Sequence, residues 1–145
     1  HNHNNCISTS LSELEKYCQK SDQKLSKVRR KVLEILLESH KALGAYEILD
    51  KLKSNGFASQ PPVAYRAINF LLKVGFVHKI EKFNSYIACT NPGKSHKPAF
   101  LICRKCNLVS ETIQKPSNEI SLEAKNNNFC IENSIIEIIG VCQNC

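Results

Sequence analysis

The sequence predicts an α+β fold in two small parts. Within the first ninety or so of the 145 residues, apolar side chains recur at helical spacing, and two short runs typical of strands then follow. The remaining residues contain three strand-like runs, one helical segment and two Cys-x-x-Cys pairs. A chain of this length can form one ordinary domain or two small ones, each with a thin core.

Two helices are expected before residue 40. Leu11, Leu14 and Cys18 recur at helical spacing and predict a short first helix. The residues before it, 1–8, are interpreted as a disordered tail. Ser26 is a suitable N-cap for a second helix. The side chains expected to face inward from this second helix are Val28, Val32, Ile35 and Leu36.

Two more helices are expected between residues 44 and 75. Gly44-Ala45 begins the third, and Asn55-Gly56 ends it because glycine adopts the left-handed conformation at little cost. Pro61-Pro62 begins the fourth, since proline is favoured in the first turn, and Gly75 ends it.

A β-hairpin is expected directly after the fourth helix. Its strands are residues 76–80 and 85–89, with Phe83 and Asn84 at the centre of the turn. That turn would place His78 and Cys89 directly opposite each other on one face. Helices followed by a hairpin in this order describe a winged helix–turn–helix domain, which we assign to residues 1–91.

A turn-rich hinge, residues 92–96, is expected to connect this domain to a small α/β domain over residues 97–145. The segments expected in the second domain are strands at 99–103, 108–112 and 135–141 and a helix at about 116–125. Its last strand carries more isoleucine than one small core needs: Ile135, Ile136, Ile138 and Ile139. This excess favours a homodimer joined through the second domain.

The cysteines form two pairs in the second domain, Cys103 with Cys106 and Cys142 with Cys145. Each pair can occupy two adjacent corners of a tetrahedral zinc ion, and two pairs complete the shell. A complete shell leaves no open position, so this zinc would be structural and would staple the small domain. Two disulfide or redox pairs are the alternative. Of the remaining cysteines, Cys18 and Cys130 are expected in the core, whereas Cys6 is expected to be exposed.

The fourth helix has a polar stripe that suits DNA. Tyr65, Arg66, Asn69 and Lys73 fall on the side opposite its apolar residues. Arginine pairs with guanine and asparagine with adenine in the major groove, although a solvated surface is the alternative. The net charge is +7, and a basic cluster suited to phosphates contains Lys24, Lys27, Arg29, Arg30 and Lys31. Tyr46 can either reach a phosphate or pack half-buried.

A second metal site is expected near the hinge. His78 and Cys89 from the hairpin, His96 after the hinge and Glu111 from the next domain offer two nitrogens, a sulfur and an oxygen, which zinc accepts. Packing or coincidence is the alternative. Because these ligands come from both sides of the hinge, bound metal would fix the orientation of the two domains and act as a sensor.

Over residues 11–145 the chain resembles the ferric uptake regulator family, and most closely its zinc-responsive branch. The runs that carry the resemblance are 61–72, 75–81, 84–86 and 100–103, together with Cys89, Cys106, Gly140, Cys142 and Cys145. The resemblance implies a structural zinc on the four paired cysteines and a regulatory zinc on His78, Cys89, His96 and Glu111. It also places Tyr65 and Arg66 in the recognition helix. His96-Lys97-Pro98-Ala99, Asn133 and Ile139 depart from the pattern of the iron-responsive branch and of a third metal site.

The resemblance implies a bacterial, cytoplasmic repressor, associated with the nucleoid when it is loaded with two Zn2+ per chain. Its expected partners are double-stranded operator DNA and a second copy of the chain, with no membrane and no small-molecule substrate. No enzyme is expected, because the sequence contains no nucleophile elbow, phosphate loop or open-site zinc motif. The alternatives are regulation by iron or manganese, and an interaction module stapled by zinc.

Overall fold

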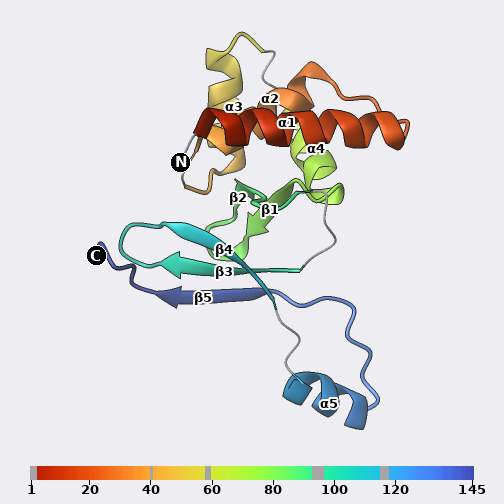
Figure 1. Ribbon diagram of the computed structural model, residues 1–145. Helices are drawn as coiled ribbons and strands as arrows, with labels where there is room; N and C mark the ends of the chain where they lie inside the picture. The colour runs from red at the N-terminus through yellow and green to blue at the C-terminus, as the bar shows by residue number, and fades with distance from the viewer. Residues whose placement is uncertain (1–2, 40, 58–59, 93–96, 115–117) are drawn as a thin grey trace. The chain divides into compact units, whose positions relative to one another are not determined.

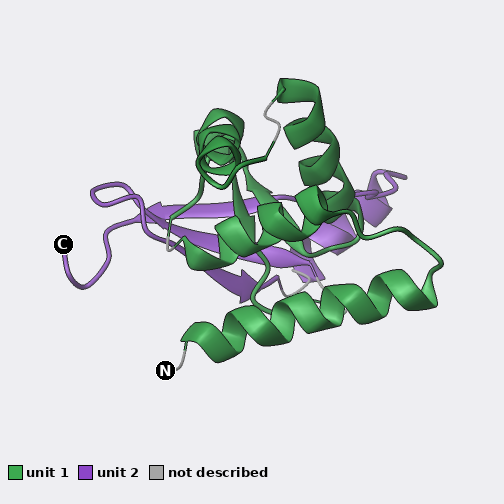
Figure 2. Ribbon diagram, turned by 90° about the horizontal axis from the view of Figure 1, so that it is seen from above, with its two compact units in different colours: residues 1–95 green, residues 96–145 purple. Residues whose placement is uncertain are grey.

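The computed structural model of the chain describes residues 3–39, 41–57, 60–92, 97–114 and 118–145. It divides into two compact units, residues 1–95 and residues 96–145 (Figure 2). The α+β class that the sequence predicts is confirmed. Among the described residues, none of the helices combines the length and the hydropathy needed to cross a membrane.

Over its described residues, the first unit contains four α-helices, a short 3-10 helix and a β-hairpin (Figure 1). Its elements are α1 (His3–Lys20), α2 (Lys27–Glu38), α3 (Ala45–Ser54), α4 (Pro61–Lys73), β1 (Val77–Ile80), the short 3-10 helix η1 (Glu81–Phe83) and β2 (Ser85–Ala88). One apolar cluster lies between the helices and the hairpin. Its most deeply buried members include Leu14, Val32, Leu36, Ile48, Leu52, Ile68, Leu71 and Phe76.

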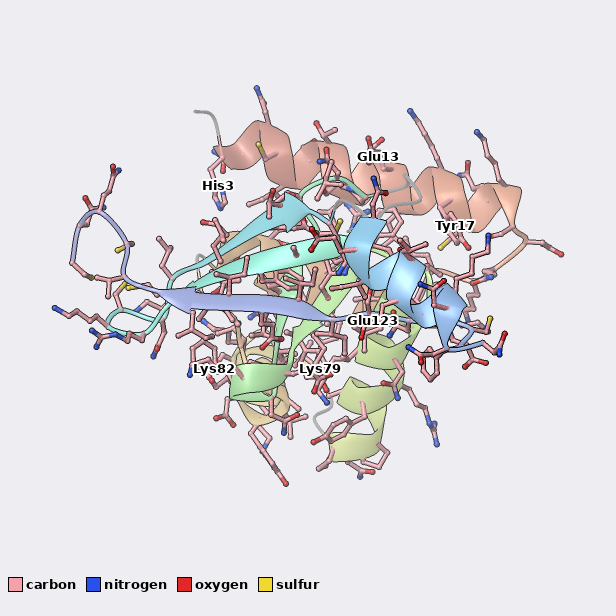
Figure 3. All side chains as sticks on the ribbon, turned by 90° about the horizontal axis from the view of Figure 1, so that it is seen from below. His3, Glu13, Tyr17, Lys79, Lys82 and Glu123 are labelled. Carbon is pink, nitrogen blue, oxygen red and sulfur yellow. The ribbon has the colours of Figure 1, made fainter. Side chains whose placement is uncertain are left out.

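Helix α1 is longer than the sequence suggests. The prediction of a disordered tail over residues 1–8 is wrong for residues 3–8, which form the first turns of the helix. Ile7 explains the difference, because it lies one turn before Leu11 and packs against the core. Tyr17, labelled on the same helix in Figure 3, contacts Phe76 edge to face with ring centroids 6.2 Å apart. The whole helix is therefore part of the first unit.

The predicted ends of the next three helices are confirmed. Ser26 caps α2, since its hydroxyl oxygen accepts a hydrogen bond from the Arg29 backbone N–H at 3.1 Å. Gly44 is the N-cap of α3. Gly75 follows α4 with a φ of 83°, a left-handed conformation that glycine adopts without strain. These ends fix where the polar stripe of α4 begins and stops.

The register of the hairpin differs from the prediction. His78 pairs with Ile87, not with Cys89. The reason is the loop, which spans four residues because η1 is followed by Asn84 in the left-handed conformation, with a φ of 48°. The register therefore shifts by two positions. A shift of two leaves every side chain on its original face, so His78 and Cys89 become diagonal neighbours.

The described residues of the second unit form a three-stranded sheet and one helix. Its elements are β3 (Pro98–Cys103), β4 (Val109–Ile113), α5 (Asn118–Asn126) and β5 (Ile136–Gly140), within one or two residues of the predicted segments. Strand β3 lies in the middle, antiparallel to β4 and parallel to β5 (Figure 1). Its buried residues are Ala99, Phe100, Ile102, Cys103 and Val109. Helix α5 buries none of its residues.

Candidate metal centres and nucleic-acid interface

Parallel pairing of β3 and β5 brings the four paired cysteines together. Cys103 ends β3 directly beside Gly140 at the end of β5. Cys106 follows in the turn after β3, while Cys142 and Cys145 lie in the turn after β5. The four sulfur atoms all lie within 4.8 Å of one another. The sheet thus turns two distant Cys-x-x-Cys pairs into one cluster.

The spacing of these sulfurs fits zinc. The Sγ atoms of Cys106 and Cys142 are 3.7 Å apart. Tetrahedral zinc with bonds of about 2.3 Å places its sulfur ligands about 3.8 Å from one another. A disulfide would require about 2.05 Å instead. The cluster could therefore hold a zinc ion, and its ligand set leaves no position open for a substrate.

The cluster is also electrostatically suited to a cation. The Cys142 backbone N–H donates to the Cys103 sulfur at 3.3 Å. This hydrogen bond, with another from the Cys106 backbone, lowers the pKa of Cys103 to about 6. The pKa of Cys145 is raised to about 12, chiefly by a hydrogen bond with the Cys142 side chain. The Cys103 thiol therefore loses its proton readily, whereas the Cys145 thiol resists deprotonation. A divalent cation bound to the cluster would favour the thiolate form of both.

The hairpin presents a second pair of ligands. A ring nitrogen of His78 and the sulfur of Cys89 lie within 4.8 Å of each other. Cys89 is buried and His78 half-buried, and the Asn91 backbone N–H lies 3.4 Å from the Cys89 sulfur. Of the other two predicted ligands, Glu111 is half-buried on β4, opposite Phe100. His96 lies outside the described residues.

Helix α4 separates into two faces as its sequence predicts. Ala64, Ala67, Ile68 and Leu71 are buried in the core. The exposed residues on the other side are Tyr65, Arg66, Asn69 and Lys73. On the preceding helix, Tyr46 is 71% exposed, so the half-buried alternative for this residue is wrong. These five polar side chains are free of the core and could contact a ligand.

Arg29 and Arg30 have contacts inside the chain that the sequence does not predict. Arg30 forms a salt bridge with Glu15 of α1. The Arg29 guanidinium lies over the ring of Phe70, with Cζ 3.9 Å from the ring centroid. Phe70 had no predicted role, although it lies one helical turn after Arg66. That spacing is the only feature of the sequence that could have pointed to it.

The three cysteines outside the proposed metal ligands divide into buried and exposed. Cys18 lies in the core as predicted, and burial raises the pKa of its thiol. Cys130 does not, which corrects the prediction of core packing. Phe129 beside it is 67% exposed. The segment follows α5, and because this helix buries none of its residues, it provides no core against which Cys130 could pack. Cys6 is exposed on α1 as expected.

Helices α3 and α4 with the hairpin define a winged-helix protein. The four-cysteine cluster of its second unit could hold a metal ion. A family model, the ferric uptake regulator family, matches residues 20–139. The chain belongs to this family.

Several relatives are similar over nearly the whole chain. The zinc uptake regulation protein of Escherichia coli (strain K12) is 36% identical over 138 residues, which cover 93% of this chain and 80% of the relative. A solved zinc uptake regulator complexed with zinc and DNA is 33% identical with a TM-score of 0.89, over 96% of this chain and 94% of that chain. The holo form of XcZur is 32% identical with a TM-score of 0.82, over 96% and 97%.

Proposed function

We propose that this protein is a zinc-responsive transcriptional repressor. It binds operator DNA as a zinc-loaded homodimer and controls the genes of zinc uptake. The observation that carries the proposal is the likeness, over 96% of the chain, to a regulator solved with zinc and DNA. The four-cysteine cluster and the exposed polar stripe on α4 support it independently, because they supply a metal site and a DNA-reading surface.

The first zinc of this proposal is structural. Cys103, Cys106, Cys142 and Cys145 would hold it, and the spacing of their sulfur atoms supports that assignment. A four-sulfur shell exchanges slowly and has no open position, so this ion would stabilise the second unit rather than report zinc levels.

The second zinc is regulatory. His78 and Cys89 would provide two of its ligands, and their proximity within the hairpin supports this assignment. His96 and Glu111 would complete the set. The thiolate favours zinc over iron or manganese, which prefer ligands richer in oxygen and nitrogen. With ligands from both units, the ion would hold the winged helix in the orientation that fits DNA and so shift the population toward the binding form.

DNA would be read by α4. Arg66 and Asn69 suit the base edges of guanine and adenine, while Tyr65, Lys73 and Tyr46 suit the backbone or a thymine methyl group. Arg29 and Arg30 from α2 would add positive charge at the phosphates. A dimer would place two such helices in successive major grooves, about 34–36 Å apart.

Dimerisation would use the second unit. Several of its apolar side chains are exposed in the single chain, including Leu101, Ile120, Leu122, Ile135, Ile138 and Ile139. A small unit with this much exposed apolar surface is expected to bury part of it against a copy of itself. Such a repressor would act in the cytoplasm, on the nucleoid when loaded with zinc, and would not be an enzyme.

The experiment that tests the function measures DNA affinity against the concentration of free metal. The protein is first used to select duplexes from a random pool at saturating zinc. Its affinity for the selected duplex is then measured as free Zn2+ and, separately, free Fe2+ or Mn2+ is varied. We expect tight binding only above a threshold of free zinc. Equal binding with iron or manganese would assign another metal, and no binding at any metal level would leave an interaction module.

A further inference from the structure

Arg29 is held in place by two contacts that leave its charge intact. Its guanidinium carbon lies 3.9 Å from the centroid of the Phe70 ring, and its Nη1 atom donates to the Lys24 carbonyl oxygen at 2.8 Å. The two helices that carry Arg29 and Phe70, α2 and α4, pack directly against each other. A guanidinium stacked on an aromatic face keeps most of its N–H donors available at its edge.

Among the residues that the structure describes, the charge of Arg29 is not balanced by a carboxylate, unlike that of its neighbours. Arg30 pairs with Glu15, and Lys31 lies 3.3 Å from Glu34. Within the ranges that the structure describes, no carboxylate lies at ion-pair distance from Arg29. A cation that is oriented but not neutralised is well prepared for an anion from outside, because little side-chain entropy is lost when the anion binds.

Phe70 places this cation beside the exposed stripe of α4. It lies four residues after Arg66 and three before Lys73, so all three residues share one side of the helix. Arg66 and Lys73 are exposed, whereas Phe70 is half-buried at the edge of the core. The Arg29 guanidinium, stacked on that ring, therefore joins Arg66 and Lys73 as a third positive charge around Phe70. Three cations on one surface repel one another, and an anion between them removes that repulsion.

We propose that Phe70 is a positioning residue for DNA binding: its ring holds the Arg29 guanidinium next to Arg66 and Lys73, so that Arg29 clamps a backbone phosphate while α4 reads bases. This inference rests on the proposed function and adds a residue to it. Arg29 sets affinity and register through the phosphate, whereas sequence preference belongs to Arg66 and Asn69. Phe70 acts through Arg29 and contacts no nucleotide.

The test uses the full-length, zinc-loaded protein and two duplexes of equal length, one selected by the wild type and one of mixed sequence. Binding is measured over a range of salt concentrations for Arg29→Met, Phe70→Leu, Phe70→Tyr and the double variant Arg29→Met/Phe70→Leu. Lys125→Met, which removes an exposed cation of the second unit, is the control for net charge. Thermal midpoints and bound zinc are measured for every variant.

We expect Arg29→Met to weaken binding to both duplexes by the same factor and to reduce the slope of log affinity against log salt by about one. Phe70→Leu should weaken binding about two- to fivefold, and Phe70→Tyr, which keeps the aromatic face, should not. In the Arg29→Met background, Phe70→Leu should cause no further loss of DNA affinity, because Phe70 acts on binding through Arg29. Lys125→Met should behave as the wild type.

Two results would overturn the inference while leaving the repressor intact. One is an unchanged salt slope in Arg29→Met, since this would mean that Arg29 contacts no phosphate. The other is an equal loss from Phe70→Leu with and without Arg29, since Phe70 would then act only by packing. A wild-type protein that binds neither duplex at any zinc level would overturn the proposed function as well.

Discussion

The sulfur atoms of Cys106 and Cys142 lie 3.7 Å apart although 36 positions of sequence separate them. They meet because β3 and β5 are parallel neighbours that end at the same edge of the sheet. Between β3 and β5 the chain forms β4 and α5, and α5 buries none of its residues. A metal ion at this edge would therefore fasten the last strand of a unit whose own core is thin.

Loss of one sulfur should unfold the second unit. Cys103→Ser removes a buried ligand that ends the central strand, and a three-ligand site holds zinc far more weakly. We expect about one zinc per chain fewer, together with loss of sheet signal and of dimers, because metal binding and folding are coupled here. Metal analysis, circular dichroism and sedimentation measure these changes. Cys130→Ser, at an exposed cysteine, is the matched control and should change none of them.

Loss of the hairpin sulfur should have a different effect. Cys89→Ser removes a proposed ligand of the regulatory zinc but leaves the four-cysteine cluster complete. We expect a folded dimer that keeps its structural zinc and no longer responds to zinc in DNA binding, a loss of about 5- to 150-fold in affinity at saturating metal. A mild chelator should produce the same state in the wild type. If Cys89→Ser and Cys103→Ser behave alike, the division into a regulatory and a structural zinc is wrong.

The local features of the first unit could be predicted because they depend on short stretches of sequence. The Ser26 cap, the Pro61-Pro62 start of α4 and the Gly75 stop each follow from the conformational preference of one or two residues. The buried face of α4 follows from helical periodicity alone. Secondary structure and the polar stripe can therefore be predicted without knowledge of tertiary contacts.

The features that were missed depend on contacts between distant segments or on loop geometry. The helical start of α1 depends on Ile7 packing against other helices. The hairpin register depends on a left-handed Asn84, which residue type alone does not dictate. The error of two positions still left His78 and Cys89 on one face, since side chains alternate with a period of two. The Arg29–Phe70 stack depends on how α2 crosses α4, which sequence spacing does not reveal.

Arg66 and Lys73 should differ in what they contribute to DNA binding. Both are exposed on α4, but an arginine can form two hydrogen bonds to guanine, whereas a lysine near the end of the helix suits a phosphate. Arg66→Ala should reduce the preference for the selected duplex over mixed sequence by about 1–3 kcal/mol. Lys73→Ala should weaken binding to both duplexes equally and lower the slope of log affinity against log salt by about one. An unchanged preference for the selected duplex in Arg66→Ala would mean that Arg66 reads no base.

Helix α1 should be an integral part of the first unit. Leu14 is fully buried, so Leu14→Ala should lower the free energy of unfolding of that unit by about 2–5 kcal/mol. Glu13→Ala changes the exposed neighbour on the same helix and should stay within about 0.5 kcal/mol of the wild type. Denaturant unfolding followed by circular dichroism provides both values. A similar, small effect of the two substitutions would mean that α1 contributes little to the core.

Strand β5 should carry the dimer contact. Ile138 pairs with Leu101 across β3 and β5, and these side chains, on one face of the sheet, are 51% and 47% exposed in the single chain. Ile138→Glu would place a carboxylate in any apolar interface on this face, which is costly without a partner charge. We expect a folded monomer that retains its structural zinc and binds DNA much more weakly, as measured by sedimentation and duplex titration. Ser54→Glu, which adds the same charge at an exposed position of α3, should remain dimeric. A dimeric Ile138→Glu variant would place the interface elsewhere in the chain.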